Sequence, residues 1–374
     1  MVYLDRSKPT HVQVVSENIT LSLHIEHPFS LEVIDMSQLT ALPRYRRLSS
    51  NAITILGMNP GKMTLQGTNT YLFGNHSSRL LIDTGEGNLE YRSNLTSVFY
   101  QENVRRISDI VLTHYHHDHI GGIEDVVSAL YHANLARKIT SLHDSKNLDA
   151  SSTLSSLSSA VHTLITSSLP SIWKNNTSFP LHSVRVSLPR APQQELLPLL
   201  APLCPVAADA LRSISNIESK LSGEAEVIEV PVRHISDGTM FRYDTDKTDP
   251  SEKSYYMSDI PKTTVAGTSD PAVGLHLHLP PGELAVVAAP GHTSDHISLL
   301  GRLASPMYDH TLSPDSLTLQ NPDASVSSVS AASPAPAQTP LVFLSGDAIL
   351  GSGSAALTDL HAYMDSLQRC RALI

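Results

Sequence analysis

The sequence has few of the features that stabilise secreted proteins or anchor proteins in membranes. Cysteine occurs only as Cys204 and Cys370, which is too few for a disulfide framework and gives no metal-binding spacing. No apolar run is long enough to cross a bilayer. The polar N-terminus, residues 1–20, lacks the apolar segment of a secretory signal. We therefore expect an intracellular protein, cytoplasmic or mitochondrial, that is not secreted and does not bind membranes.

Positive charge is also in short supply. The 374 residues include 26 Lys and Arg against 36 Asp and Glu, a net charge of −10 at pH 7. The isoelectric point is near 6.0. Such a balance gives no general attraction to nucleic acid or anionic lipid, although it does not exclude a local basic patch. A hydrophobic content of 41% predicts a packed core, in one large domain or two ordinary ones.

The most informative stretch is the pattern H-x-H-x-D-H at residues 114–119, formed by His114, His116, Asp118 and His119. It follows the apolar run 110–112, which predicts a short buried strand. Residues two apart in an extended chain face the same side, so the first two histidines can reach one metal ion. Asp118 and His119 lie where Gly121-Gly122 lets the backbone turn, and can face a second ion. Imidazole and carboxylate ligands suit zinc.

A histidine-rich surface loop is the alternative interpretation of this pattern. It is disfavoured because other parts of a metal site follow downstream. His292 comes after an expected strand at residues 284–289, and Asp347 comes after another at 341–344. Side chains of a site commonly gather where the strands of a layered α/β protein end.

These positions suggest two neighbouring metal ions. One takes His114, His116 and His292, the three-nitrogen set of catalytic zinc with an open water position. The second takes Asp118 and His119, and Asp347 bridges the two ions. His117 and His296 are predicted to be solvent-facing residues or neighbours of the ligands.

Asp83 follows the apolar part of the expected strand at residues 79–85, and two interpretations of it stay open. Its carboxylate could orient a ligand histidine from behind. It could instead form a turn or cap a helix.

Strand and helix periodicities alternate along the chain, which is typical of a layered α/β fold. Expected strands are 52–56, 70–73, 79–85, 110–112, 226–230, 284–289, 297–300 and 341–344, and expected helices are 89–104, 123–135 and 356–373. We expect an N-terminal extension at 1–50 and one domain at 51–374. A Ser-, Leu- and Pro-rich insertion at 140–225, partly helical or a flexible loop, interrupts it, as does a disordered low-complexity loop at 307–340.

Several of these motifs resemble the metallo-β-lactamase superfamily, namely the 114–119 pattern, the 290–296 turn and Ser345-Gly346-Asp347. Residues 59–71, 81–86 and 345–351 resemble one branch of it more closely, the lactamase-like protein 2 group. That group includes a mitochondrial lactamase-like endoribonuclease and fungal thioesterases that release polyketides from acyl carrier protein. The resemblance covers about residues 50–135 and 226–374, with gaps.

The resemblance implies a four-layer αββα sandwich, here with insertions, and two zinc ions. It implies hydrolysis by a metal-bound hydroxide, with Asp118 as a metal ligand and a catalytic residue that orients the hydroxide. The implied substrate is an acyl thioester, in some relatives bound to a carrier protein, or single-stranded RNA.

The sequence departs from this family at its end. Relatives carry a further ligand histidine in a Gly-His loop some tens of residues after the bridging aspartate. Here His361 is the only histidine after Asp347, and it lies in a stretch that matches a helix of the family. We therefore expect an incomplete second zinc site and a truncated C-terminus. Truncation of the gene product, an incomplete gene model and a genuine variant with weakened affinity for the second ion all stay open as explanations. This leaves an alternative function, a catalytically impaired or non-enzymatic member of the family.

Overall fold

The computed structural model describes most of the expected domain. The described ranges are residues 41–144, 160–188, 226–243, 281–303, 340–350 and 355–373, with the backbone of 11–16 and 19–24 and the single positions Leu197, Ala201, Pro205, Ala208, Asp209 and Leu279. The low-complexity loop expected at 307–340 lies outside them except for its last residue, and so does much of the segment expected to be an insertion.

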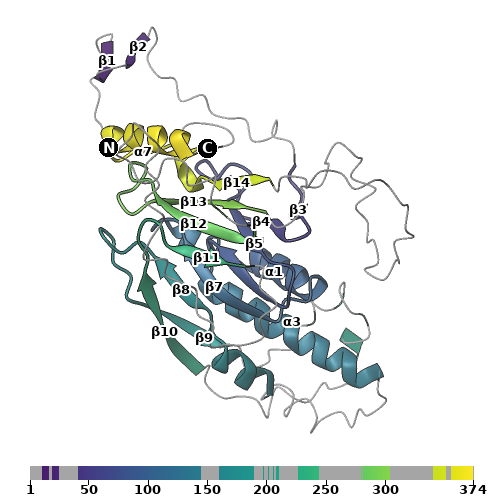
Figure 1. Ribbon diagram of the computed structural model, residues 1–374. Helices are drawn as coiled ribbons and strands as arrows, with labels where there is room; N and C mark the ends of the chain where they lie inside the picture. Colours follow the sequence, from purple (N-terminus) through teal and green to yellow (C-terminus); the bar gives the residue numbers. More distant parts are fainter. Residues whose placement is uncertain are drawn as a thin grey trace, which may run out of the picture.

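Two β-sheets form the centre of the molecule (Figure 1). The larger has eight strands in the order β3-β4-β5-β6-β7-β8-β10-β9. Their bounds are β3 Tyr45–Ser49, β4 Ala52–Leu56, β5 Asn69–Phe73, β6 Ser78–Ile82, β7 Arg106–Leu112, β8 Ser171–Lys174, β9 Ser183–Leu188 and β10 Glu226–His234. The smaller sheet has the order β11-β12-β13-β14, with bounds Met240–Arg242, Glu283–Ala288, Ile297–Arg302 and Leu341–Leu344. A separate hairpin pairs β1 (His11–Ser16) with β2 (Ile19–His24).

Helices cover the outer faces of the two sheets. Helices α1 (Leu89–Gln101) and α3 (Ile123–Asp144) pack on the larger sheet, and α7 (Leu360–Leu373) lies beside the smaller one (Figure 1). Two short helices, α2 (His117–Ile120) and η4 (Gly346–Ala348), lie next to the candidate ligands. No described helix is long and apolar enough to cross a bilayer.

Three hydrophobic clusters separate these layers. The first lies between the helix pair α1/α3 and the larger sheet, the second between the sheets, and the third between the smaller sheet and α7. Strand β12 contributes side chains to two of these clusters. Because successive side chains alternate across a strand, Leu284 and Val286 point between the sheets, while Ala285 and Val287 face α7. The four-layer αββα prediction is confirmed.

The segment expected to be an insertion contributes directly to this core. Strand β8 lies between β7 and β10 and runs parallel to both, with Ile172 and Trp173 fully buried. Strand β9 pairs with β10 at the edge. Two apolar residues in a four-residue strand give too short a pattern for periodicity to identify it. Residues 160–167 are helical, in line with the helix expected in part of this segment.

Several boundaries differ from the expected ones. Helix α3 continues to Asp144 rather than ending near 135, and α7 starts at Leu360 rather than 356. Strand β14 is expected to be buried, but three of its four residues are only partly buried, because it is the edge strand of the smaller sheet.

Candidate metal centre

Three histidine nitrogens converge where the two sheets meet. His114 and His116 follow β7 of the larger sheet, and His292 lies in the loop between β12 and β13 of the smaller one. The Nε2 atom of His114 lies 2.9 Å from Nδ1 of His116 and 3.3 Å from Nε2 of His292. The remaining side of the triangle, from His116 to His292, measures 3.0 Å. Asp347 completes a group of four side chains that could hold a metal ion.

The outer contacts of these rings determine which nitrogen faces the centre. His292 Nδ1 lies 2.5 Å from the carbonyl oxygen of Ala356, so it donates its proton there. His114 Nδ1 lies 3.1 Å from the hydroxyl of Thr113, which itself donates to Asp83. Both rings therefore present an Nε2 lone pair to the centre.

Lone pairs packed this closely repel one another unless a cation lies between them. Burial and the neighbouring histidines lower the pKa of His114 well below its ordinary value, so a proton is disfavoured there. Tetrahedral zinc with bonds of about 2.0–2.1 Å would separate its nitrogen ligands by about 3.3 Å. One observed spacing, 3.3 Å, equals this value and the other two, 2.9 and 3.0 Å, are slightly shorter, so the three nitrogens lie close enough to share one such ion.

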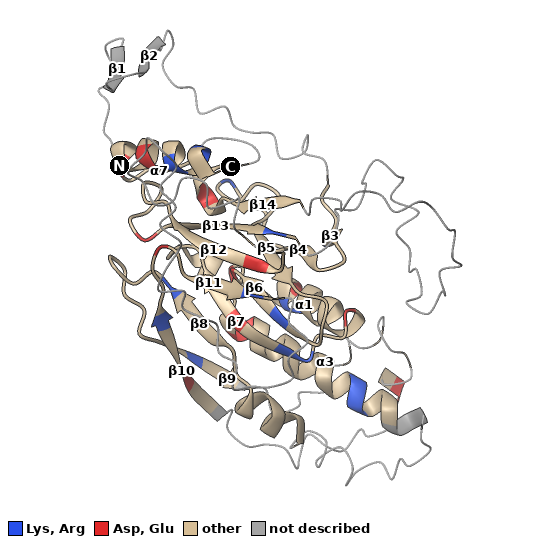
Figure 2. Ribbon diagram, viewed as in Figure 1, with Lys and Arg blue, Asp and Glu red and all other residues tan. Residues whose placement is uncertain are grey.

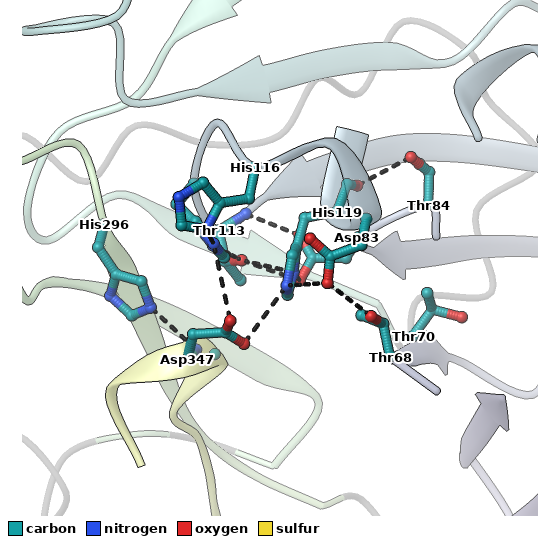
Figure 3. Close-up of polar contacts among 12 residues, drawn as sticks. Thr68, Thr70, Asp83, Thr84, Thr113, His116, His119, His296 and Asp347 are labelled. Carbon is teal, nitrogen blue, oxygen red and sulfur yellow. Dashed lines mark hydrogen bonds and ion pairs between the residues drawn. The ribbon is translucent and has the colours of Figure 1, made fainter. Parts of the chain in front are cut away.

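His119 forms a second position beside the first (Figure 3). Its Nε2 atom lies 3.3 Å from an oxygen of Asp118 and 3.3 Å from Oδ1 of Asp347. That nitrogen is buried and has no hydrogen-bond partner among the described residues. Burial lowers the pKa of His119, but the surrounding carboxylates outweigh this effect and raise it well above its usual value. The position thus attracts positive charge, from a proton or a metal ion.

Asp347 spans both positions. Its Oδ1 faces His119, while its Oδ2 lies 3.6 Å from Nε2 of His292 and 3.9 Å from Nε2 of His114. Its backbone N–H donates to Nε2 of His296 over 3.1 Å. Burial lowers the pKa of His296 to about 3, so this ring is neutral and able to accept. His296 is thus a neighbour of the ligands, as predicted, and it orients Asp347.

The other two histidines in question stay outside the cluster. His117 is exposed on α2 although it lies within the motif. His361 lies on α7 beside Asp365, and its side chain is 91% exposed. Among the described residues, His119 is the one histidine with a nitrogen within 3.3 Å of a carboxylate oxygen of Asp118 or Asp347. The second position therefore has a single histidine in the part of the chain that the structure describes.

The carboxylate of Asp83 lies behind the site. One oxygen accepts the backbone N–H of Thr113 at 2.8 Å, and the other lies 2.8 Å from Nδ1 of His119. Its backbone has a left-handed φ of 58°, which is uncommon for a residue other than glycine. Of the two interpretations of Asp83, the structure supports the carboxylate that orients a histidine.

The two glycines after the motif act differently from the expectation. Gly121 has ordinary helical angles, φ −68° and ψ −26°, so it is not needed for a special turn. A Cβ atom on Gly122 would lie 1.9 Å from the carbonyl oxygen of Thr84. The glycines are needed because the motif packs directly against the end of β6, where the N–H of Thr84 donates to the carbonyl of His119 over 2.8 Å.

Sequence reasoning missed a hydroxyl that contacts Asp118. Thr68 donates to Asp118 Oδ2 over 2.7 Å, and Asn59 accepts the N–H of Thr68 over 2.9 Å. Burial alone would raise the pKa of Asp118, but His119 and the Thr68 hydroxyl outweigh it and hold this pKa well below its usual value. Asp118 is therefore ionised. Asn59 and Thr68 both belong to the 59–71 motif, and this motif was the feature of the sequence that could have indicated the contact.

A cavity of about 450 Å³ opens onto the second position. Its lining includes the polar side chains of Asp118, His119 and Asp347. It also includes the apolar side chains of Leu42, Met63, Leu65, Ile349 and Leu350. Met63 is 80% exposed and Ile349 51% exposed, so apolar surface remains uncovered at the mouth. The described lining residues include no Lys or Arg.

Fold and site together define a layered α/β protein with a group of histidines and aspartates at the junction of its sheets that could hold a metal ion. Residues 63–152 match the family described as the Metallo-beta-lactamase superfamily. This range contains His114, His116, Asp118 and His119. The resemblance of the chain to this superfamily is confirmed.

Curated relatives give a narrower placement. The beta-lactamase-like protein 2 homolog of Drosophila melanogaster is 52% identical over 87 residues, which are 23% of this chain and 30% of that protein. Lactamase-like protein nscB of Neosartorya fischeri is 52% identical over 90 residues, 24% of this chain and 27% of that protein. The Caenorhabditis elegans beta-lactamase-like protein 2 homolog is 47% identical over 96 residues, 25% and 32% of the two chains. The similarity to the lactamase-like group is thus confirmed, over less than a third of each relative's length.

Among solved structures, the native FEZ-1 metallo-beta-lactamase from Legionella gormanii matches with 9% identity and a TM-score of 0.34. The match covers 88% of this chain and 76% of that one. This overall similarity is too low to bear on the chemistry of the site.

Proposed function

We propose that this chain is a zinc-dependent hydrolase that acts on an acyl thioester. The observation that carries the hydrolase proposal is the convergence of the His114, His116 and His292 nitrogens to within 2.9–3.3 Å of one another. The buried Nε2 of His119, which lies 3.3 Å from carboxylate oxygens of both Asp118 and Asp347, supports a second ion beside the first. When bound, zinc acts as a Lewis acid toward a carbonyl oxygen and lowers the pKa of a water ligand.

The protein side chains would bind the ions and orient the attacking water. The three histidines would hold one ion, His119 and Asp118 would hold the other, and Asp347, which lies between the two positions, would contribute to both. The Asp118 carboxylate is ionised and partly exposed to the cavity, so it can accept a hydrogen bond from the attacking water and orient it. Thr68 holds that carboxylate in place.

The cavity favours a thioester over RNA. Cleavage of RNA requires contacts to phosphates, which Lys and Arg usually supply, and the described lining residues contain neither. Lys and Arg are distributed among Asp and Glu over the visible helices and strands (Figure 2). The exposed apolar side chains of Met63 and Ile349 suit an acyl chain instead.

The purified full chain would test this proposal in two steps. Elemental analysis should find close to two zinc ions per chain. Acyl thioesters of increasing chain length should then be hydrolysed faster than single-stranded RNA is cleaved. Met63→Glu should reduce kcat/KM for long acyl chains more than for acetyl thioester, because it places a charge at the apolar mouth. Salt-sensitive RNA cleavage without thioester turnover would contradict the choice of substrate.

The same experiment distinguishes the non-enzymatic alternative. A folded chain that binds one zinc ion or none and turns over neither substrate would be an impaired member of the family. The described residues give the second position His119, Asp118 and a share of Asp347, so the zinc count is the deciding measurement.

A further inference from the structure

A buried ion pair crosses the boundary between the two sheets close to the histidine triangle. Lys174 ends β8 of the larger sheet, and Asp295 lies in the loop between β12 and β13 of the smaller sheet. Lys174 Nζ lies 2.6 Å from Asp295 Oδ2, and the two side chains are 1% and 0% exposed. A pair so completely removed from water is weak evidence for stability, because the loss of hydration offsets much of the attraction.

The contacts of Lys174 indicate a more specific role. Its ammonium group also donates to the carbonyl oxygens of Asn175 over 3.0 Å and Phe179 over 2.8 Å, so all three of its protons have acceptors. The ring of Phe179 stacks on Tyr115 at a centroid distance of 3.9 Å. Tyr115 in turn packs edge-on against His116 at 4.7 Å. Through this series of contacts Lys174 helps to fix the position of the His116 ring.

Asp295 fixes the loop that carries His292, the third histidine of the triangle. It lies three residues after His292 in the same loop, and its second oxygen accepts the hydroxyl proton of Thr293 over 2.7 Å. Both carboxylate oxygens are therefore occupied, and the loop has one defined position relative to β8. Lys174 is also paired in register with Leu112, two residues before His114.

We propose that the Lys174–Asp295 ion pair is a positioning element of the metal centre, which holds His292 against His114 and His116. The triangle draws its nitrogens from two different sheets, so it requires a fixed distance between them. The hydrophobic contacts between the sheets are non-directional, whereas a buried ion pair with three further hydrogen bonds is directional and favours one geometry. This inference rests on the proposed metal-binding function.

The test compares zinc affinity among variants of the full chain. The double variant Lys174→Met with Asp295→Asn removes both charges and leaves no unpaired ion in the core. Its circular dichroism should match the wild type, while its zinc affinity, measured by competition with a chromophoric chelator, falls at least tenfold. The cobalt(II) absorption spectrum should also change, because the ligand geometry is altered.

A matched control removes an ion pair of the smaller sheet away from this loop. The double variant Arg242→Met with Glu283→Gln should keep the wild-type zinc affinity. If the double variant Lys174→Met with Asp295→Asn does not fold, Thr293→Val tests the positioning role instead. This substitution removes the hydroxyl that donates to Asp295 and leaves both charges in place. Thr293→Val should lower zinc affinity and Thr293→Ser should restore it.

The outcomes separate the two proposals. Wild-type affinity and spectrum in a folded double variant, or in Thr293→Val if the double variant is unfolded, would overturn the positioning role alone. An equal loss of affinity in the Arg242 and Glu283 control would overturn it as well. A wild-type chain that binds no zinc would overturn the proposed function and this inference with it.

Discussion

Asp83 and His119 are 36 positions apart in the sequence and in direct contact in the fold. An Asp83 oxygen lies 2.8 Å from Nδ1 of His119, and both side chains are 3% exposed. This contact assigns the Nδ1 proton to the Asp83 side and directs Nε2 toward Asp118 and Asp347. A carboxylate behind a ligand histidine fixes the ring and raises its basicity.

Replacement of Asp83 should therefore weaken the second metal position. In Asp83→Asn an amide replaces the carboxylate that accepts from Thr113 and His119, so we expect zinc affinity at one of the two positions to fall about 10–100-fold. Calorimetric titration of the metal-free chain with zinc measures this. Asp109→Asn is the control, because it changes a buried carboxylate that contacts Trp173 and should leave both affinities intact. A uniform loss of both metals would contradict a local effect.

His116 and His117 offer a comparison of neighbouring residues. His116→Ala removes one nitrogen of the triangle, and we expect zinc content to fall by at least one ion per chain because too few ligands remain. His117→Ala changes an exposed side chain outside the cluster and should retain full zinc content. Elemental analysis after gel filtration measures both. Equal zinc in the two variants would show that the triangle does not hold metal.

The hydroxyl of Thr68 should matter for turnover. Thr68→Val keeps the shape of the side chain but removes the donor to Asp118, so we expect kcat to fall about tenfold or more, with little change in KM. Thr68→Ser keeps the hydroxyl and should recover most of the activity. Steady-state kinetics on a thioester substrate provides the measurement. Failure of serine to recover activity would point to packing rather than to the hydrogen bond.

His132 should make the stability of the fold depend on pH. It is completely buried in α3, neither ring nitrogen has a hydrogen-bond partner among the described residues, and burial, aided by Arg92, lowers its pKa to about 3. The unfolded chain titrates near the ordinary value of 6.5 and so binds an extra proton between these two pH values. The contribution of His132 is fully present above pH 6.5 and is lost as the pH falls toward 3, by up to about 1.4 kcal/mol per pH unit.

His132→Leu should flatten this dependence. Urea unfolding of the metal-free chain, at several pH values from 7 downward, should show a shallower loss of stability than in the wild type, by roughly one proton. His361→Leu changes a histidine that is 91% exposed and should leave the slope unchanged. An unaltered slope in His132→Leu would mean that the ring is not buried as a neutral group.

Local patterns in the sequence predicted much of the architecture. The continuous apolar run at 284–289, which stops before Pro290, predicted β12, because that strand is buried on both faces. Spacing brought His114 and His116 to one side of the chain, and the structure places their nitrogens 2.9 Å apart. These inferences worked because strand periodicity and the two-residue spacing are properties of a few neighbouring residues.

Other features depend on contacts between distant segments, which no local pattern records. Asp83 had two equal interpretations until the packing of β6 against the metal loop placed it behind His119. The predicted insertion contains β8, whose four residues become a central strand only through pairing with β7 and β10. Lys174 is one of 26 basic residues in the sequence. The sequence by itself determined which side chains could bind metal. Only the packing of the two sheets decided which other residues contact and orient those side chains, because these contacts join segments that are distant along the chain.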